Sequence, residues 1–182
     1  NNRNSRENLV KKTTLPLLLT ALLAAQFGYG LTSDRDQPIS IEADSAFVDD
    51  ANGVTIYEGN ALITQGTLHI AADKVKVIMS ESEVIEIIAS MAPKSEALAH
   101  YEQVPEEDDG LISADAQIIT YFIQEEKLHL AGKAHLQQTQ NEFAGELLYY
   151  NMTTGVVDLK GGKSGRVSIT LQPKKKLTPK IQ

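Results

Sequence analysis

The sequence contains neither cysteine nor tryptophan, and aromatic residues make up only 5% of its 182 residues. The lack of cysteine excludes disulfide bonds and thiolate metal ligands, so the fold must be stabilised by apolar burial and hydrogen bonds. Because aromatic residues are few, we expect isoleucine, valine and leucine to line the core. The apolar run Leu15–Ala25 has eleven residues, whereas a membrane-spanning helix needs about twenty.

That run follows a basic stretch and precedes the small residues Gly28 and Gly30. This order is typical of a secretory signal peptide, and we expect residues 1–30 to be cleaved off during export. The alternative is a membrane anchor. The shortness of the run and the lack of a charged flank after it disfavour this alternative.

The charge of the chain is acidic. The whole sequence has 17 basic and 24 acidic residues, a net charge of −7. The leader holds four of the basic residues and one acidic residue, so residues 31–182 carry 13 and 23, a net charge of −10. Nucleic acids are bound through lysine and arginine contacts to phosphates, so a nucleic-acid partner is not expected.

A repeated pattern dominates the exported part. An acidic residue, a strand-like run, a turn, a second run and a glycine occur in that order at residues 43–59, 114–132 and 145–161, and more weakly at 72–89. Alternating apolar and polar residues, as in 68–77 and 167–171, predict half-buried strands. A repeat of this length indicates stacked β-hairpins that share one core. Residues 80–90 also fit a short helix, but their place in the repeat favours turn and strand.

The part of the chain after the leader divides into one domain and a tail. We expect one β domain over residues 31–172, followed by a basic, disordered tail over residues 173–182. Pro105 and the acidic run 106–110 predict an exposed hairpin tip. A calcium site is the alternative there, but the spaced Asp and Asn ligands of a calcium loop are absent from the sequence.

The sequence offers no recognisable catalytic constellation. The histidines at 69, 100, 129 and 135 lack the helical spacing of a zinc motif. Residues 161–164 resemble the end of a phosphate loop, but the preceding glycine and the following helix that such a loop needs are missing. The recurrent acidic residues Asp44, Asp73, Asp115 and Glu146 indicate a turn or strand-edge role. We therefore expect neither enzymatic activity nor a cofactor or metal site.

Four stretches carry a resemblance to a known family. Gln37–Asp44 and Tyr57–Ala61, together with Thr64–Leu68 and Ala72–Val75, resemble the OstA-like family, which includes the periplasmic lipopolysaccharide-transport bridge proteins. The similarity extends over roughly residues 36–171. It implies an open, twisted antiparallel β-jellyroll with an apolar interior groove, located in the periplasm. It also implies that lipopolysaccharide moves along the groove from the inner to the outer membrane.

The resemblance assigns roles to particular apolar residues. We expect the inward-facing ones to line a groove for the acyl chains of lipid A: Ile56, Ile63, Ile70, Val75, Val77, Ile87, Leu130, Leu136, Phe143 and Leu148. The alternative for each of them is ordinary core packing. Each exposed CH₂ of an acyl chain costs about 0.8 kcal/mol in water, so a dry groove is what such a carrier requires.

The family also implies partners at both ends of the domain. Ile39 and Ile41 at the amino-terminal edge, and Val167, Ile169 and Leu171 at the carboxy-terminal edge, would pair with neighbouring units. Those neighbours are the inner-membrane and outer-membrane bridge components and further copies of the chain, joined head to tail. Two other hypotheses remain open: a structural protein that polymerises through its edges without lipid, and a periplasmic hydrolase on a β-solenoid.

Overall fold

The computed structural model describes residues 33–105, 110–163 and 165–173, and these residues belong to one compact unit, Leu31–Gln182. The expected leader, most of the acidic run and nearly all of the expected basic tail lie outside the described residues. Within the described part, no helix is long and apolar enough to cross a membrane. The regular structure there is almost entirely β-strand, with two short 3-10 helices, η1 (Asp34–Asp36) and η2 (Asp50–Asn52).

The strands are β1 (Ser40–Glu42), β2 (Ser45–Asp49), β3 (Val54–Gln65), β4 (Leu68–Ser80), β5 (Glu83–Ser90), β6 (Ala99–Gln103), β7 (Ile112–Ala116), β8 (Ile118–Phe122), β9 (Lys127–Gln138), β10 (Asn141–Asn151), β11 (Val156–Lys160) and β12 (Ser168–Thr170). Every pairing between them is antiparallel. The all-β, antiparallel class predicted from the sequence is therefore confirmed, and residues 83–90 are strand rather than helix.

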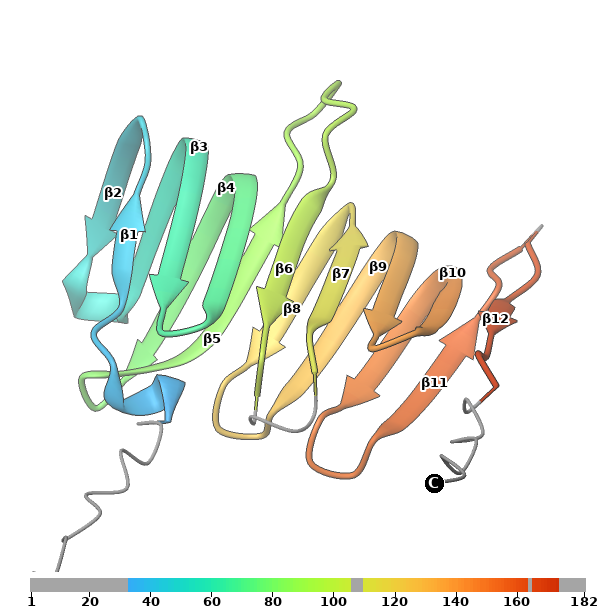
Figure 1. Ribbon diagram of the computed structural model, residues 1–182. Helices are drawn as coiled ribbons and strands as arrows, with labels where there is room; N and C mark the ends of the chain where they lie inside the picture. The colour runs from blue at the N-terminus through green and yellow to red at the C-terminus, as the bar shows by residue number, and fades with distance from the viewer. Residues whose placement is uncertain (1–32, 106–109, 164, 174–182) are drawn as a thin grey trace, which may run out of the picture. The chain divides into compact units, whose positions relative to one another are not determined.

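The strands form two layers because four long strands each pair with different neighbours along their two halves. β3 pairs with β2 and then with β1, and β4 pairs with β6 and then with β5. β9 and β10 divide in the same way, β9 between β8 and β7 and β10 between β11 and β12. The back layer thus has the order β2-β3-β4-β5-β8-β9-β10-β11, and the front layer β1-β3-β4-β6-β7-β9-β10-β12 (Figure 1).

Two of the long strands, β3 and β9, bend at a glycine. Gly59 and Asn60 have φ of 81° and 48°, and Gly132 and Lys133 have φ of 77° and 52°. The register of the ladders shifts at both sites. A left-handed backbone is easiest for glycine, and a bulge turns the strand. Figure 1 shows these bends along the upper edge of the molecule. Gly59 and Gly132 of the sequence repeat are therefore points at which a strand passes from one layer to the other.

Two of the acidic residues of the repeat, Asp44 and Asp73, lie at the first of these bends. Asp44 accepts a hydrogen bond from the side chain of Asn60, and its own backbone N–H donates to the carbonyl of Gly59. Asp73 lies opposite that bulge and accepts from the backbone N–H of Ala92, a bond that lowers the pKa of Asp73. The turn role expected for these residues holds for Asp44 and Asp73. In the second repeat, Gln117 rather than Asp115 donates to Gly132.

Candidate functional site

The interior between the two layers is lined by apolar residues from ten of the strands. Of the ten residues predicted to face inward, eight are at most 3% exposed and belong to one buried cluster: Ile63, Ile70, Val75, Val77, Ile87, Leu130, Leu136 and Leu148. Phe143 is half-buried and packs against the same cluster. The structure thus brings nine of the predicted residues together. Whether they contact lipid remains a prediction.

Ile56 does not lie among them. It alternates with Thr55, which is 8% exposed, and with Tyr57, which packs against the buried cluster. Its cross-strand partners are Phe47 and Lys76, which puts Ile56 on the outer face of the back layer. The prediction that Ile56 faces inward is wrong, because β3 keeps one alternation from Thr55 to Gln65 and a neighbouring threonine takes the inner position.

Sequence reasoning missed the tyrosines of the interior. Tyr101 from β6 and Tyr121 from β8 make an edge-to-face contact with ring centroids 5.4 Å apart. The Tyr101 hydroxyl donates to the side-chain oxygen of Gln103 and lies 3.6 Å from the sulfur of Met152. Burial raises the pKa of Tyr101 well above its ordinary value, so this hydroxyl stays protonated. The alternation Ala99-x-Tyr101-x-Gln103 is the signal in the sequence that marks this strand.

The two ends of the sheet are formed by short strands. Within the described residues, β1 and β2 pair only with β3, and β11 and β12 pair only with β10. Ile41 lies in β1 opposite Ile63, and Ile39 packs against the core just before it. At the other end Ile169 lies opposite Phe143 and is 52% exposed, and Val167 and Leu171 are exposed beside it. The residues predicted to form edges therefore lie at the two ends, in or next to strands with one unpaired side.

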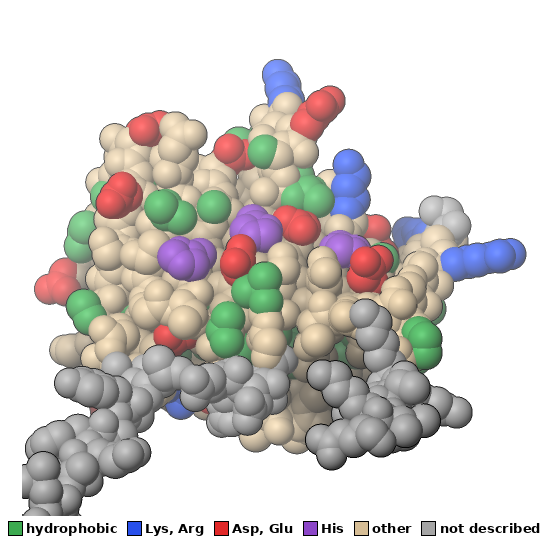
Figure 2. Space-filling model, viewed as in Figure 1, with side chains coloured by type: hydrophobic (Ala, Val, Ile, Leu, Met, Phe, Trp, Pro, Cys, Tyr) green, Lys and Arg blue, Asp and Glu red, His purple; other side chains and the backbone are tan. Residues whose placement is uncertain are grey.

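The outer face of the front layer carries histidines and carboxylates among scattered apolar side chains (Figure 2). His100 Nδ1 is 2.8 Å from Asp115 Oδ1, and His100 Nε2 is 3.6 Å from Glu102 Oε2. No group of three or more potential ligands among the described residues is arranged to hold a metal ion. This face is a solvated, hydrogen-bonded surface.

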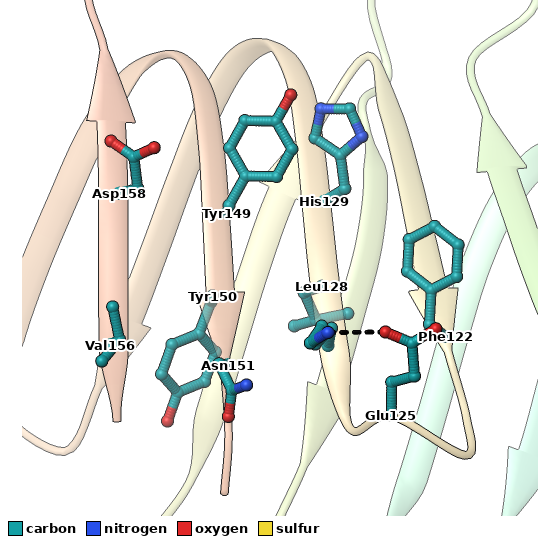
Figure 3. A pocket seen from close by; sticks show the side chains of 10 residues that line it. Phe122, Glu125, Leu128, His129, Tyr149, Tyr150, Asn151, Val156 and Asp158 are labelled. Carbon is teal, nitrogen blue, oxygen red and sulfur yellow. Dashed lines mark hydrogen bonds and ion pairs between the residues drawn. The ribbon is translucent and has the colours of Figure 1, made fainter. Parts of the chain in front are cut away.

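An apolar hollow of about 350 Å³ lies on the outer face of the back layer, over β8 to β11 (Figure 3). Phe122, Tyr149 and Val156 line it, and the ion pair of Lys127 with Glu125 lies at its side. The Tyr149 ring stacks on His129 with centroids 4.2 Å apart. None of the ten predicted groove residues lines this hollow, so it is separate from the interior.

Burial lowers the pKa of His129 below its ordinary value of 6.5. A histidine with a lowered pKa binds its proton more weakly in the folded state, so stability at this site falls as the pH drops through about 6.5. We expect the His129 ring to titrate below pH 6.5 in an NMR titration. A Tyr149→Ala variant, which uncovers the ring, should move the midpoint upward. A midpoint above 6.5 in the unaltered protein would contradict this.

Comparison with known proteins gives consistent matches. Residues 40–156 match the family described as LptA/(LptD N-terminal domain) LPS transport protein. The lipopolysaccharide export system protein LptH of Pseudomonas aeruginosa is 34% identical over 173 residues, covering 90% of this chain and 96% of that protein. The corresponding LptA of Escherichia coli K12 is 32% identical over 165 residues, covering 89% and 86%.

A solved structure agrees with the fold. The crystal structure of LptH, described as the LptA homologous periplasmic component of the conserved lipopolysaccharide transport device from Pseudomonas aeruginosa, matches with a TM-score of 0.67 and 29% sequence identity. The match covers 78% of this chain and all of that chain. These findings confirm the resemblance drawn from the sequence. The chain belongs to the LptA/(LptD N-terminal domain) family of lipopolysaccharide transport proteins.

Proposed function

We propose that this chain carries lipopolysaccharide through the periplasm, from the inner to the outer membrane of a Gram-negative bacterium, as one unit of a protein bridge. The observation that carries the proposal is the continuous apolar interior between two antiparallel layers, in a chain of this family. In this proposal residues 1–30 direct export and are cleaved. Transport proceeds by binding, without bond-making chemistry.

The interior is suited to hold acyl chains. Burying a twelve-carbon chain is worth on the order of 10 kcal/mol at about 0.8 kcal/mol per CH₂, so the chains alone supply most of the affinity. The nine inward-facing predicted residues would line the groove of an open β-jellyroll. The net charge of the protein does not add to the affinity for lipopolysaccharide, because residues 31–182 and lipopolysaccharide are both acidic.

Acyl chains must enter where the layers are least firmly joined. Along the upper edge the bent strands β3, β4, β9 and β10 connect the layers covalently. Along the lower edge lie the hairpin turns, among them residues 66–67, 81–82 and 123–126, and the contacts across it include side-chain contacts such as Tyr101 with Tyr121. The interior residues are fully packed in this structure. The lower edge, called the turn edge below, is therefore the side at which the layers part.

End-to-end assembly follows from the strand directions. Each layer contains eight strands of alternating direction, so β2 of a second copy can continue the back layer beyond β11 in an antiparallel ladder. In the same way β1 can continue the front layer beyond β12. A heterologous contact of this kind repeats without closing, as a bridge requires. The same surfaces would receive the inner-membrane and outer-membrane components.

The test is displacement of a fluorescent apolar probe from the purified protein by lipopolysaccharide. We expect saturable displacement, and at least a tenfold loss of affinity in an Ile70→Asp variant, because a carboxylate in the interior opposes burial of acyl chains. His69→Asp is the matched control, since His69 is the adjacent residue on the outer face of β4. It should bind as the unaltered protein does.

Circular dichroism of both variants shows whether they remain folded. A smaller interior change, Leu136→Met, keeps the volume and should preserve both fold and binding. If the unaltered protein does not release the probe to lipopolysaccharide, the interior is an ordinary core. The function would then be that of a polymer that joins through its edges without lipid.

A further inference from the structure

A short segment before β1 crosses the turn edge and contacts both layers. It comprises Ser33–Gln37 with the 3-10 helix η1, and it is called the strap below. Figure 1 shows η1 at the lower edge of the molecule, near the turns. The strap is not part of either sheet. Its contacts therefore join the layers at the edge where no strand passes between them.

The strap is attached to the front layer by Asp34. One carboxylate oxygen accepts from the backbone N–H of Thr67 at 2.7 Å, and the other accepts from the Thr67 hydroxyl at 2.6 Å. The side-chain amide of Gln103, at the end of β6, donates to the same carboxylate at 2.9 Å. Gln65 adds a bond from its side chain to the carbonyl of Gln37 at 3.0 Å.

Arg35 attaches the strap to the back layer. One guanidinium nitrogen donates to the backbone carbonyl of Ile123 and to the carboxylate of Glu126, both at 2.8 Å. Both acceptors lie in the turn 123–126 between β8 and β9. The Arg35–Glu126 pair is about half exposed on both sides, so it is weak and can exchange partners with solutes. Asp34 and Arg35, adjacent in sequence, thus hold opposite layers.

Two hollows flank the strap at the turn edge. One, of about 330 Å³, is lined by Ile39, Val84 and Ile123 together with the carboxylate of Glu83. The other, of about 40 Å³, is lined by Tyr121 and Met152 together with the carboxylates of Asp34 and Glu126. Arg35 lines both hollows. Among the described residues that line them, no other residue is basic. An amphiphile entering the interior here would place its chains beside apolar side chains and its headgroup beside the guanidinium.

We infer that Arg35 senses the headgroup and that the strap is a gate: a phosphorylated headgroup takes the guanidinium from Glu126 and releases the turn edge. This inference rests on the proposed function. Arginine can bind phosphate in a bidentate fashion, whereas Arg35 contacts the exposed Glu126 carboxylate through a single guanidinium nitrogen. Losing the back-layer contact leaves the strap held by the front layer alone, through Asp34 and the Gln65–Gln37 bond. These remaining bonds then open more often, and the layers are free to part. Phosphorylated amphiphiles open the gate and neutral ones do not.

Hydrogen exchange of the Thr67 amide measures the state of the strap, because that N–H donates to Asp34. We expect lipopolysaccharide to raise its exchange rate about tenfold, the factor that corresponds to losing one hydrogen bond to a charged group. Dodecyl maltoside, a neutral amphiphile, should leave the rate unchanged, and so should inorganic phosphate alone. An increase with either of these two would overturn the inference.

Variants of the strap contacts test the gate in the absence of lipid, again by exchange of the Thr67 amide. Arg35→Gln should raise Thr67 exchange about tenfold, after which lipopolysaccharide adds little. Glu126→Gln keeps the Ile123 bond and should give a smaller rise. Lys127→Gln is the matched control, because Lys127 pairs with Glu125 in the same turn without contacting the strap. Unchanged Ile70 exchange would show that the interior stays folded.

The outcomes separate the two proposals. If lipopolysaccharide fails to displace the apolar probe, the proposed function fails and the headgroup role fails with it. If it displaces the probe while Thr67 exchange is unchanged, transport stands and the gate is overturned. Unchanged exchange in Arg35→Gln also overturns the gate.

Discussion

A Val48→Lys variant is expected to weaken end-to-end association of the protein by about 100-fold. Val48 lies in β2 opposite the buried Thr55 and is 66% exposed, so it marks the point where the core reaches the end of the sheet. A second copy would cover it. Burial of one such side chain is worth about 1.5 to 3 kcal/mol, and 100-fold corresponds to about 2.7 kcal/mol. A lysine at an edge also opposes strand pairing.

Sedimentation velocity over a range of concentrations measures this. Ile169→Lys should have the same effect from the other end, since Ile169 lies in β12 opposite Phe143 and is 52% exposed. Ile118→Lys is the matched control: Ile118 is 43% exposed, but it lies in β8, in the middle of the sheet. That substitution should leave association unchanged.

A mixture of the two edge variants distinguishes the kind of contact. In a head-to-tail assembly, the intact amino-terminal end of Ile169→Lys can still pair with the intact carboxy-terminal end of Val48→Lys. Each variant alone should therefore be monomeric, and the mixture should form a one-to-one dimer that grows no further. If Ile169→Lys alone still forms dimers, two amino-terminal ends pair with each other and the proposed bridge geometry is wrong.

The second large effect is on stability. Gly132→Ala should lower the free energy of unfolding by about 3 kcal/mol, of which 1 to 2 comes from the left-handed backbone and the rest from crowding. At a φ of 77°, an added Cβ would lie 2.7 Å from Cδ and 3.0 Å from Cβ of Gln117. Gln117 cannot withdraw easily, because its backbone N–H donates to the carbonyl of Gly132 at 2.8 Å.

Gly155 supplies the control for this prediction. It has a similar φ of 68°, but an added Cβ would meet no atom within 4 Å. Gly155→Ala should therefore cost only the backbone part, about 1 kcal/mol. Urea unfolding of both variants measures the difference. Equal losses in the two would show that crowding at the bend contributes nothing.

The sequence predicts the strands well because most of them follow a strict alternation. In β9, Leu128, Leu130, Gly132, Ala134 and Leu136 are buried and the residues that alternate with them are not, as the period of two requires. In β4 the alternation changes phase at Asp73, so that Ile70 and Val75, five residues apart, both face inward. Both were predicted inward because each lies in its own short alternating run.

Predicting the inward-facing residues from hydrophobicity fails where the alternation of the strand places a less apolar residue in the interior. Ile56 is more apolar than its neighbour Thr55, yet Thr55 occupies the inner position because β3 does not change phase. The strap and the tyrosine contacts of the interior were not predictable for another reason. Asp34 and Thr67, or Tyr101 and Met152, meet only through tertiary packing, and no periodicity links them.

Because the two layers have the same number of strands, each copy would lengthen both layers of an assembly by the same fixed amount. Each layer contains eight strands, and neighbouring strands lie about 4.8 Å apart, so each added copy would extend an assembly by about 38 Å. The span of a bridge can then change only in steps of that size. Any distance that is not a whole number of steps must be taken up by the components at its two ends, or by the spacing of the membranes themselves.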